Sequence, residues 1–180
     1  MRIVIPSLFA LLLVVLLGAS MRAGGDIAPP VFIGATPELP QIDTSNSPQT
    51  ITFTIHITDD LSGIAHASVR WVHQLGYNTN RDCGWNSESA SGTNIFVPCA
   101  VTFPQYSAEG KWMVQFVRVD DRVGNKRYIY STVPIYSDSK VVGYEYSAEA
   151  TPAIRAMEIT IGDPVTTTDP PLYLPSIMAN

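Results

Sequence analysis

Two acidic turns contain the residues of this chain that are best suited to chemistry. Their sequences are Asp59-Asp60-Leu61-Ser62-Gly63 and Asp120-Asp121-Arg122-Val123-Gly124-Asn125. An aspartate in such a turn accepts hydrogen bonds from backbone N–H groups a few residues on, and glycine or asparagine adopts a positive φ at low cost. Turn formation is therefore the first explanation for six of these residues, namely Asp60, Ser62, Gly63, Asp121, Gly124 and Asn125.

Calcium binding is the alternative explanation for the same turns. Ca²⁺ takes about six to eight oxygen ligands. The side chains that could supply them are Asp59, Asp60, Asp120, Asp121 and Asn125. Their spacing is not that of an EF-hand, and the sequence leaves open whether the two turns meet at one end of the molecule. We expect no cofactor unless this Ca²⁺ site forms.

No motif typical of an enzyme accompanies the turns. The chain contains 3 His together with many Ser and Asp. It lacks the G-x-S-x-G, H-E-x-x-H, P-loop and dinucleotide patterns. The mere presence of Ser, His and Asp does not define a triad, because the geometry must be shown. We expect a non-catalytic protein, with a secreted hydrolase as a distant alternative.

The charge pattern argues against a nucleic-acid partner. The net charge is −5, and the 11 basic residues are scattered, with Lys126-Arg127 as their closest cluster. Neutralising phosphates requires clustered Lys and Arg. The expected partner is therefore an unknown protein or glycan.

The N-terminus predicts export. Arg2 precedes an apolar segment over residues 3–17, and its uninterrupted part, residues 8–17, is short for a membrane span. Gly18-Ala19-Ser20 offers small residues for cleavage. We expect residues 1–20 to be a signal peptide, with an uncleaved anchor as the alternative. The mature chain would then have no membrane span and would be secreted or held at the cell surface or envelope.

Two cysteines, Cys83 and Cys99, are present. An even number in an exported chain favours a disulfide, with a reduced pair as the alternative. Closing a loop of this length stabilises a fold by about 3 kcal/mol in the chain-entropy model. Tyr77 and Trp85 lie in or beside this loop, and we expect them to be either a contact surface for a partner or packed residues.

Alternating hydrophobicity predicts the strands that position these features. Residues 50–58 place Ile and Phe on one face and polar residues on the other. Residues 65–73 place Trp71 on a buried face. The spacing of apolar residues shifts within 111–119, which predicts a bulge at Gln115-Phe116. Residues 126–136 are expected to form a single partner strand.

These segments predict an all-β fold, an antiparallel β-sandwich. Residues 21–30 are expected to be a linker, and the sandwich occupies residues 31–146. Residues 147–180 are expected to form a C-terminal extension with one added strand at most, followed by an extended, mobile tail rich in Thr and Pro.

Four motifs in order resemble the Ig-like domains of bacterial exported and cell-surface proteins. They are Asp59-Asp60-Leu61-Ser62-Gly63-Ile64, Val69-Arg70-Trp71, Gly110-Lys111-Trp112 and Asp121-x-x-Gly124-Asn125. The resemblance covers about residues 42–136 and implies an immunoglobulin- or fibronectin-type sandwich. It also implies a non-catalytic role in binding, adhesion or spacing. The segment between the cysteines and the residues after Tyr136 fall outside the pattern.

Overall fold

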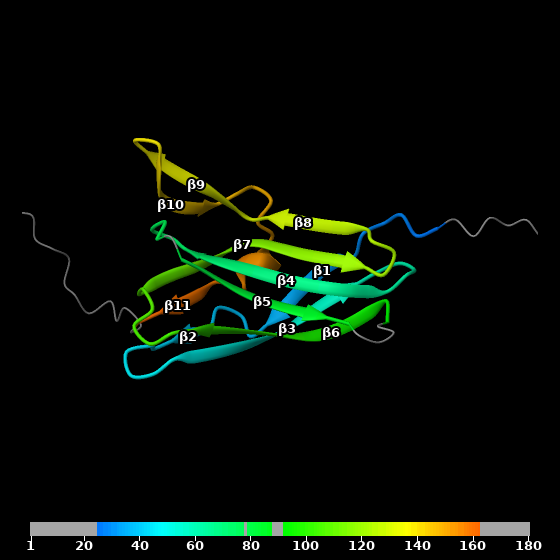
Figure 1. Ribbon diagram of the computed structural model, residues 1–180, viewed down its shortest axis with the longest axis horizontal. Coiled ribbons are helices and arrows are strands. Elements are labelled where there is room, and N and C mark those ends of the chain that lie inside the picture. Colours follow the sequence, from blue (N-terminus) through cyan, green and yellow to red (C-terminus); the bar gives the residue numbers. More distant parts are fainter. Residues whose placement is uncertain (1–24, 78, 88–91, 163–180) are drawn as a thin grey trace, which may run out of the picture.

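The protein is described by a computed structural model, which covers residues 25–77, 79–87 and 92–162. Its strands form three sheets (Figure 1). The first is antiparallel, in the order β1 (Val31–Thr36), β3 (Gln49–Thr58) and β6 (Asn94–Phe103). On β3 the Ile and Phe side chains are buried while Thr50, Thr52 and Thr54 are exposed, as the alternating pattern predicts.

The second sheet has six strands. Its members are β2 (Gln41–Ile42), β11 (Ile159–Ile161), β7 (Gly110–Asp121), β4 (Ile64–His73), β5 (Asn80–Asn86) and β8 (Lys126–Tyr130). The first five follow that order and β8 pairs with β7. Every pair is antiparallel except β2 with β11. The predicted all-β fold with antiparallel sheets is therefore confirmed.

One hydrophobic core joins these two sheets. Phe53 of β3 and Trp71 of β4 stack with their ring centroids 5.3 Å apart, and both are fully buried. The predicted disulfide is confirmed: Cys83 of β5 is bonded to Cys99 of β6. Because β5 and β6 belong to different sheets, this bond connects the two layers covalently.

The third sheet is a hairpin, which we call the arm. It consists of β9 (Thr132–Ser137) and β10 (Lys140–Tyr146). Asp138 and Ser139 form its turn with φ values of 49° and 63°, as a tight hairpin turn requires. Figure 1 shows the arm standing away from the rest of the molecule at the upper left.

A bulge in β7 explains where the arm begins. Arg70 and Trp71 of β4 pair with Phe116 and Val114, so Gln115 is the extra residue and the predicted bulge is present. Ser131 follows β8. Its N–H donates to the Gln115 carbonyl at 2.9 Å, and its hydroxyl donates to the Val114 carbonyl at 2.5 Å. The prediction of one strand over residues 126–136 is wrong, because these bonds end β8 at Tyr130 and redirect the chain into β9.

The folded body continues beyond Tyr146, the end expected for the sandwich. A short helix, α2 (Pro152–Arg155), is capped by Thr151 and is followed by β11. Ile154, Met157 and Ile159 are fully buried in the core, and the Trp71 indole donates to the Met157 carbonyl at 2.9 Å. The expected tail after residue 162 lies outside the described residues, as does the expected signal peptide. No helix among the described residues is both long and apolar enough to cross a membrane.

Candidate functional site

The first acidic turn is held by Asp59. Its Oδ2 accepts hydrogen bonds from the N–H groups of Gly63 at 2.6 Å and Leu61 at 3.3 Å. Gly63 has a φ of 82°, which suits glycine. The sequence assigned this role to Asp60, but the Asp60 side chain is exposed and Asp59 makes the bonds instead.

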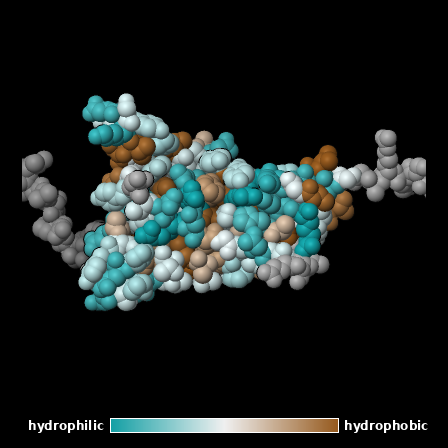
Figure 2. Space-filling model, in the orientation of Figure 1, coloured by the Kyte–Doolittle hydropathy of each residue, from teal (hydrophilic) through white to brown (hydrophobic). Residues whose placement is uncertain are grey.

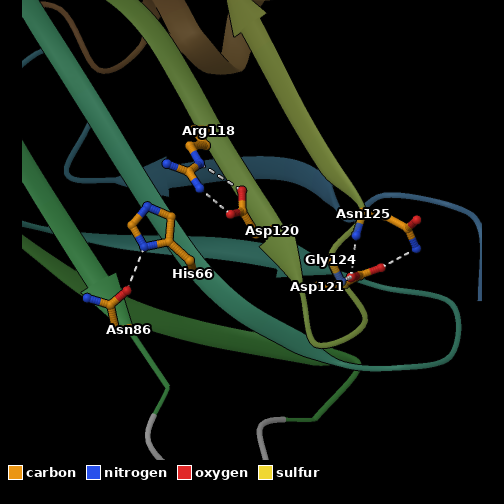
Figure 3. Close-up of polar contacts among 7 residues, drawn as sticks. All are labelled: His66, Asn86, Arg118, Asp120, Asp121, Gly124 and Asn125. Atoms are coloured by element: carbon orange, nitrogen blue, oxygen red, sulfur yellow. Dashed lines mark hydrogen bonds and ion pairs between the residues drawn. The ribbon is translucent and has the colours of Figure 1, made fainter.

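The second turn is organised by Asp121, as its sequence predicts. The carboxylate Oδ1 accepts hydrogen bonds from the N–H groups of Val123, Gly124 and Asn125 at 3.0, 2.7 and 2.7 Å. Its Oδ2 accepts a further bond from the Asn125 side-chain amide at 2.6 Å (Figure 3). Asp121 is only 3% exposed, and these donors stabilise its charge in that buried position.

Asp26 brings the two turns together. Its Oδ2 accepts from the N–H of Ser62 at 2.9 Å, and its carbonyl accepts from the Asn125 amide at 3.1 Å. Carboxylate oxygens of Asp26, Asp59 and Asp121 all lie within 4.8 Å of one another. We call this cluster the acidic pole. Asp26 was placed in the linker by the sequence, because no spacing motif connects it to either turn.

Two other predicted calcium ligands have different surroundings. Desolvation and then the nearby negative charge of Asp26 raise the pKa of Asp60 above 3.8. Asp120 lies outside the acidic pole and forms a two-bond ion pair with Arg118 on the same strand (Figure 3). The structure therefore brings together Asp59, Asp121 and Asn125 of the predicted ligands and directs Asp120 to another partner.

The outer face of the six-stranded sheet carries cross-strand rows of charged and aromatic side chains. Arg70 forms an ion pair with Asp82 at 2.6 Å and lies 5.2 Å from the Phe116 ring centroid. Arg118 lies 5.4 Å from the Tyr128 ring centroid, and Tyr128 stacks with Tyr130. Each of the two arginines is therefore held by both a carboxylate and a ring.

Each histidine side chain has a hydrogen-bond partner that is neither Ser nor Asp in the part of the chain that the structure describes. Nδ1 of His66 lies 2.7 Å from Oδ1 of Asn86 (Figure 3), and Nε2 of His56 lies 2.8 Å from Oδ1 of Asn94. His73 is fully buried, and its Nε2 lies 2.7 Å from the Glu109 carbonyl. These partners are not those of a Ser-His-Asp triad.

A close backbone contact fixes the arm against the loop that follows β4. A Cβ added at Gly76 would lie 2.8 Å from the Gly143 N, and one added at Gly143 would lie 2.9 Å from the Gln74 carbonyl. The Tyr144 N–H donates to that same carbonyl at 2.8 Å. Only glycine at these positions lets the arm approach so closely.

A cleft of about 940 Å³ lies between the arm and the outer face of the sheet. We call it the arm cleft. Polar side chains from both walls line it, among them Arg70, Tyr77, Asn80, Arg81, Lys140 and Tyr144. Its volume is at the upper end of the range typical of ligand-binding pockets. Figure 2 shows the arm above the sheet, with hydrophobic side chains beside hydrophilic ones.

The two aromatic residues of the Cys loop have different surroundings. Tyr77 lines the arm cleft, is 51% exposed and stacks on His73 at 4.6 Å. Trp85 is half-buried and packs against the core from β5. The geometry therefore suits Tyr77 to contact with a partner and Trp85 to packing. Part of the loop between the cysteines, residues 88–91, lies outside the described residues.

Comparison with known proteins found no family model, no curated protein and no solved structure that matches this chain.

Proposed function

We propose that the chain is an exported, non-catalytic Ig-like module that binds its partner in the arm cleft. The cleft carries this proposal, because an opening of about 940 Å³ has walls from two different sheets and contains the half-exposed Tyr77. A tyrosine held by a neighbouring ring offers contact area at a low cost in side-chain entropy.

Two packed layers and a bond between them support the Ig-like part of the proposal. In immunoglobulin-type sandwiches a buried Trp packs near a disulfide that joins the layers. Here Phe53 pairs with Cys99 and stacks on Trp71, which gives a comparable arrangement. A buried disulfide also suits an oxidising compartment, in keeping with a signal peptide over residues 1–20 and a secreted or surface location.

Mapping of ligand contacts tests the binding function. A panel of oligosaccharides and peptides would be titrated into the isotope-labelled protein while its amide NMR signals are followed. We expect signals of Tyr77, Asn80 and Tyr144 to move, and Tyr77→Ala to weaken binding. Tyr106→Ala is the matched control, because Tyr106 is also exposed and does not line the cleft. Shifts clustered elsewhere, with no effect of Tyr77→Ala, would contradict the proposal.

A calcium-stabilised structural module is the second candidate. Three carboxylates converge at the acidic pole, and Oδ1 of Asp59 is buried with no hydrogen-bond partner. Against this, backbone N–H groups already occupy oxygens of all three, which is what turn formation alone requires. A ligand that binds only the folded state must raise the melting temperature. Titration with Ca²⁺, with Mg²⁺ as control, tests this candidate, and an unchanged melting temperature rejects it.

A further inference from the structure

His73, the last residue of β4, is a fully buried histidine beside the place where the arm is attached. Tyr77 stacks on its ring at 4.6 Å, and Trp112 meets the ring edge-to-face with the centroids 5.4 Å apart. A Cβ added at Gly110 would lie 3.3 Å from Nε2 of His73. The imidazole is therefore closely surrounded, and the polar atoms beside it decide which of its protonation states fits.

The two ring nitrogens of His73 have partners that require the neutral ring. A carbonyl can only accept, so Nε2, which lies 2.7 Å from the Glu109 carbonyl oxygen, carries a hydrogen. A backbone N–H can only donate, so Nδ1, which lies 3.2 Å from the Leu75 nitrogen, carries none. The protonated ring has two donors and no acceptor. A proton added to Nδ1 would therefore face the Leu75 N–H and break that hydrogen bond.

The charged groups around the ring do not compensate for such a proton. None of the ion pairs in the described parts of the chain includes His73. On β5, Arg81 places its guanidinium 5.5 Å from the centroid of the same Trp112 ring that His73 contacts, so the charge on that side is also positive. Before β7, Glu109 is exposed and contributes its carbonyl. The Tyr77 hydroxyl ionises only at about pH 10. A buried and unpaired charge is costly, so the protonated ring is favoured in water.

The backbone that bonds to this ring also holds the arm. Residues 74–77, which we call the anchor loop, follow β4 directly. The Leu75 N–H donates to the His73 ring, while the Gln74 carbonyl accepts a hydrogen bond from the Tyr144 N–H of the arm at 2.8 Å. Adjacent residues of one short loop therefore connect the protonation state of the histidine to the attachment of β10.

We propose that protonation of His73 in mild acid releases the anchor loop and, with it, the arm. Loss of the Leu75 hydrogen bond frees the loop to move. Tyr77 covers one face of the His73 ring and is itself 51% exposed, so its departure opens the ring to water. The arm then loses its bond to the Gln74 carbonyl, and the arm cleft opens. This switch concerns the attachment of the arm, so it holds whether or not the cleft binds a partner.

Proton counting gives the direction and size of the effect. The open arm binds one proton more than the closed arm, because the released imidazole titrates as an exposed histidine does, at about pH 6.5. The closed arm is therefore favoured above this pH, and opening becomes easier as the pH falls below it. Between about pH 7.5 and about pH 5.5 the opening equilibrium should rise about tenfold. Ordinary carboxylates titrate at about pH 4, so they remain ionised over this interval.

Amide hydrogen exchange of the full chain at about pH 7.5 and about pH 5.5, corrected for the intrinsic rates, tests the inference. We expect exchange in the anchor loop, β9 and β10 to become about tenfold faster in acid, and exchange in β3 to stay unchanged. His73→Gln should abolish this response, because Gln keeps a donor for the Glu109 carbonyl and does not titrate. His66→Gln is the matched control, because His66 lies near the other end of β4 and bonds to Asn86. This variant should keep the response.

Nitrogen NMR of the histidine rings in the unaltered chain gives a second measurement that needs no variant. We expect a hydrogen on Nε2 of His73 and none on Nδ1 at about pH 7.5, and a change of the His73 ring and of the Tyr144 amide with one common midpoint. A hydrogen on Nδ1 at that pH, or titration of His73 without a change at Tyr144, overturns the inference. Unchanged exchange of the arm in acid overturns it as well, and so does an acid response that persists in folded His73→Gln. Melting temperatures establish that each variant is folded, and if His73→Gln is not, the NMR titration decides.

Discussion

The two turns that form the acidic pole and the arm that bounds the arm cleft lie at opposite ends of the molecule in Figure 1. The two sites differ in how their polar groups are satisfied. At the pole, backbone N–H groups of the same turns bond to the carboxylates of Asp59 and Asp121. In the cleft, Lys140 is exposed and has no carboxylate partner among the described residues. Charged groups bonded to their own backbone stabilise a fold, whereas unpaired ones facing a cleft are available to a ligand.

Asp121→Ala should have the largest effect, because it removes four hydrogen bonds that a buried carboxylate accepts. We expect the free energy of unfolding to fall by about 3 kcal/mol, as donors to a charged acceptor lose their partner. Urea denaturation measures this value. The exposed Asp60→Ala should leave stability nearly unchanged, and an equal loss in both variants would contradict the turn role of Asp121.

The variants Trp85→Ala and Tyr77→Ala test which of these two aromatic residues packs within the fold and which contacts a partner. Trp85 packs against the core, so its truncation should cost about 2 kcal/mol of unfolding free energy, less than for a fully buried Trp. Tyr77→Ala should change stability little and weaken ligand binding. Thermal melting measures the stability of each variant, and calorimetric titration measures its affinity for the ligand. The reverse result would make Trp85 the contact residue.

Gly143→Ala tests whether the arm depends on its glycine contact. The added Cβ would lie 2.9 Å from the Gln74 carbonyl, so the arm must move. We expect a loss of about 1–2 kcal/mol, typical of overpacking, with faster amide hydrogen exchange in β9 and β10.

Gly84→Ala is the matched control for Gly143→Ala. A Cβ at Gly84 meets its nearest atom at 3.8 Å, which is an ordinary contact. Hydrogen exchange that rises equally throughout the molecule in Gly143→Ala would show that the arm is not a separate unit.

Asp60→Asn should give the smallest change, and its sign depends on pH. The folded-state pKa of Asp60 is raised by desolvation and then by the charge of Asp26. A raised pKa means that Asp60 destabilises the folded state at neutral pH and that this penalty is relieved as the pH falls through the raised pKa. We expect Asp60→Asn to raise the melting temperature at pH 7 and to lose this advantage in acid. An advantage that is independent of pH would exclude the electrostatic cause.

Local patterns in the sequence were sufficient for some of the strands and for one of the two acidic turns. The alternation over β3, the bulge at Gln115 and the Asp121 turn each depend on residues close in sequence, and the structure contains all three. The two cysteines were also paired correctly, because no other pairing exists within the chain.

Features that depend on distant contacts were not predictable in the same way. Asp26 joins the acidic pole through bonds to Ser62 and Asn125, which lie far along the chain. β8 ends because Ser131 bonds to the bulge of β7, so the arm, and with it the cleft, follows from a contact that no local pattern records. Tyr77 was singled out by residue type alone, and its place in the cleft depends on the Gly76–Gly143 approach.

The described chain enters the body at β1 and leaves it at β11, at opposite ends in Figure 1. β1 is paired with β3, and β11 lies between β2 and β7. A pulling force applied through the two ends would therefore act along these strands and strain their hydrogen bonds together instead of one at a time. Strands sheared in this way resist extension better than strands peeled apart, so we expect the described body to resist extension through its two ends.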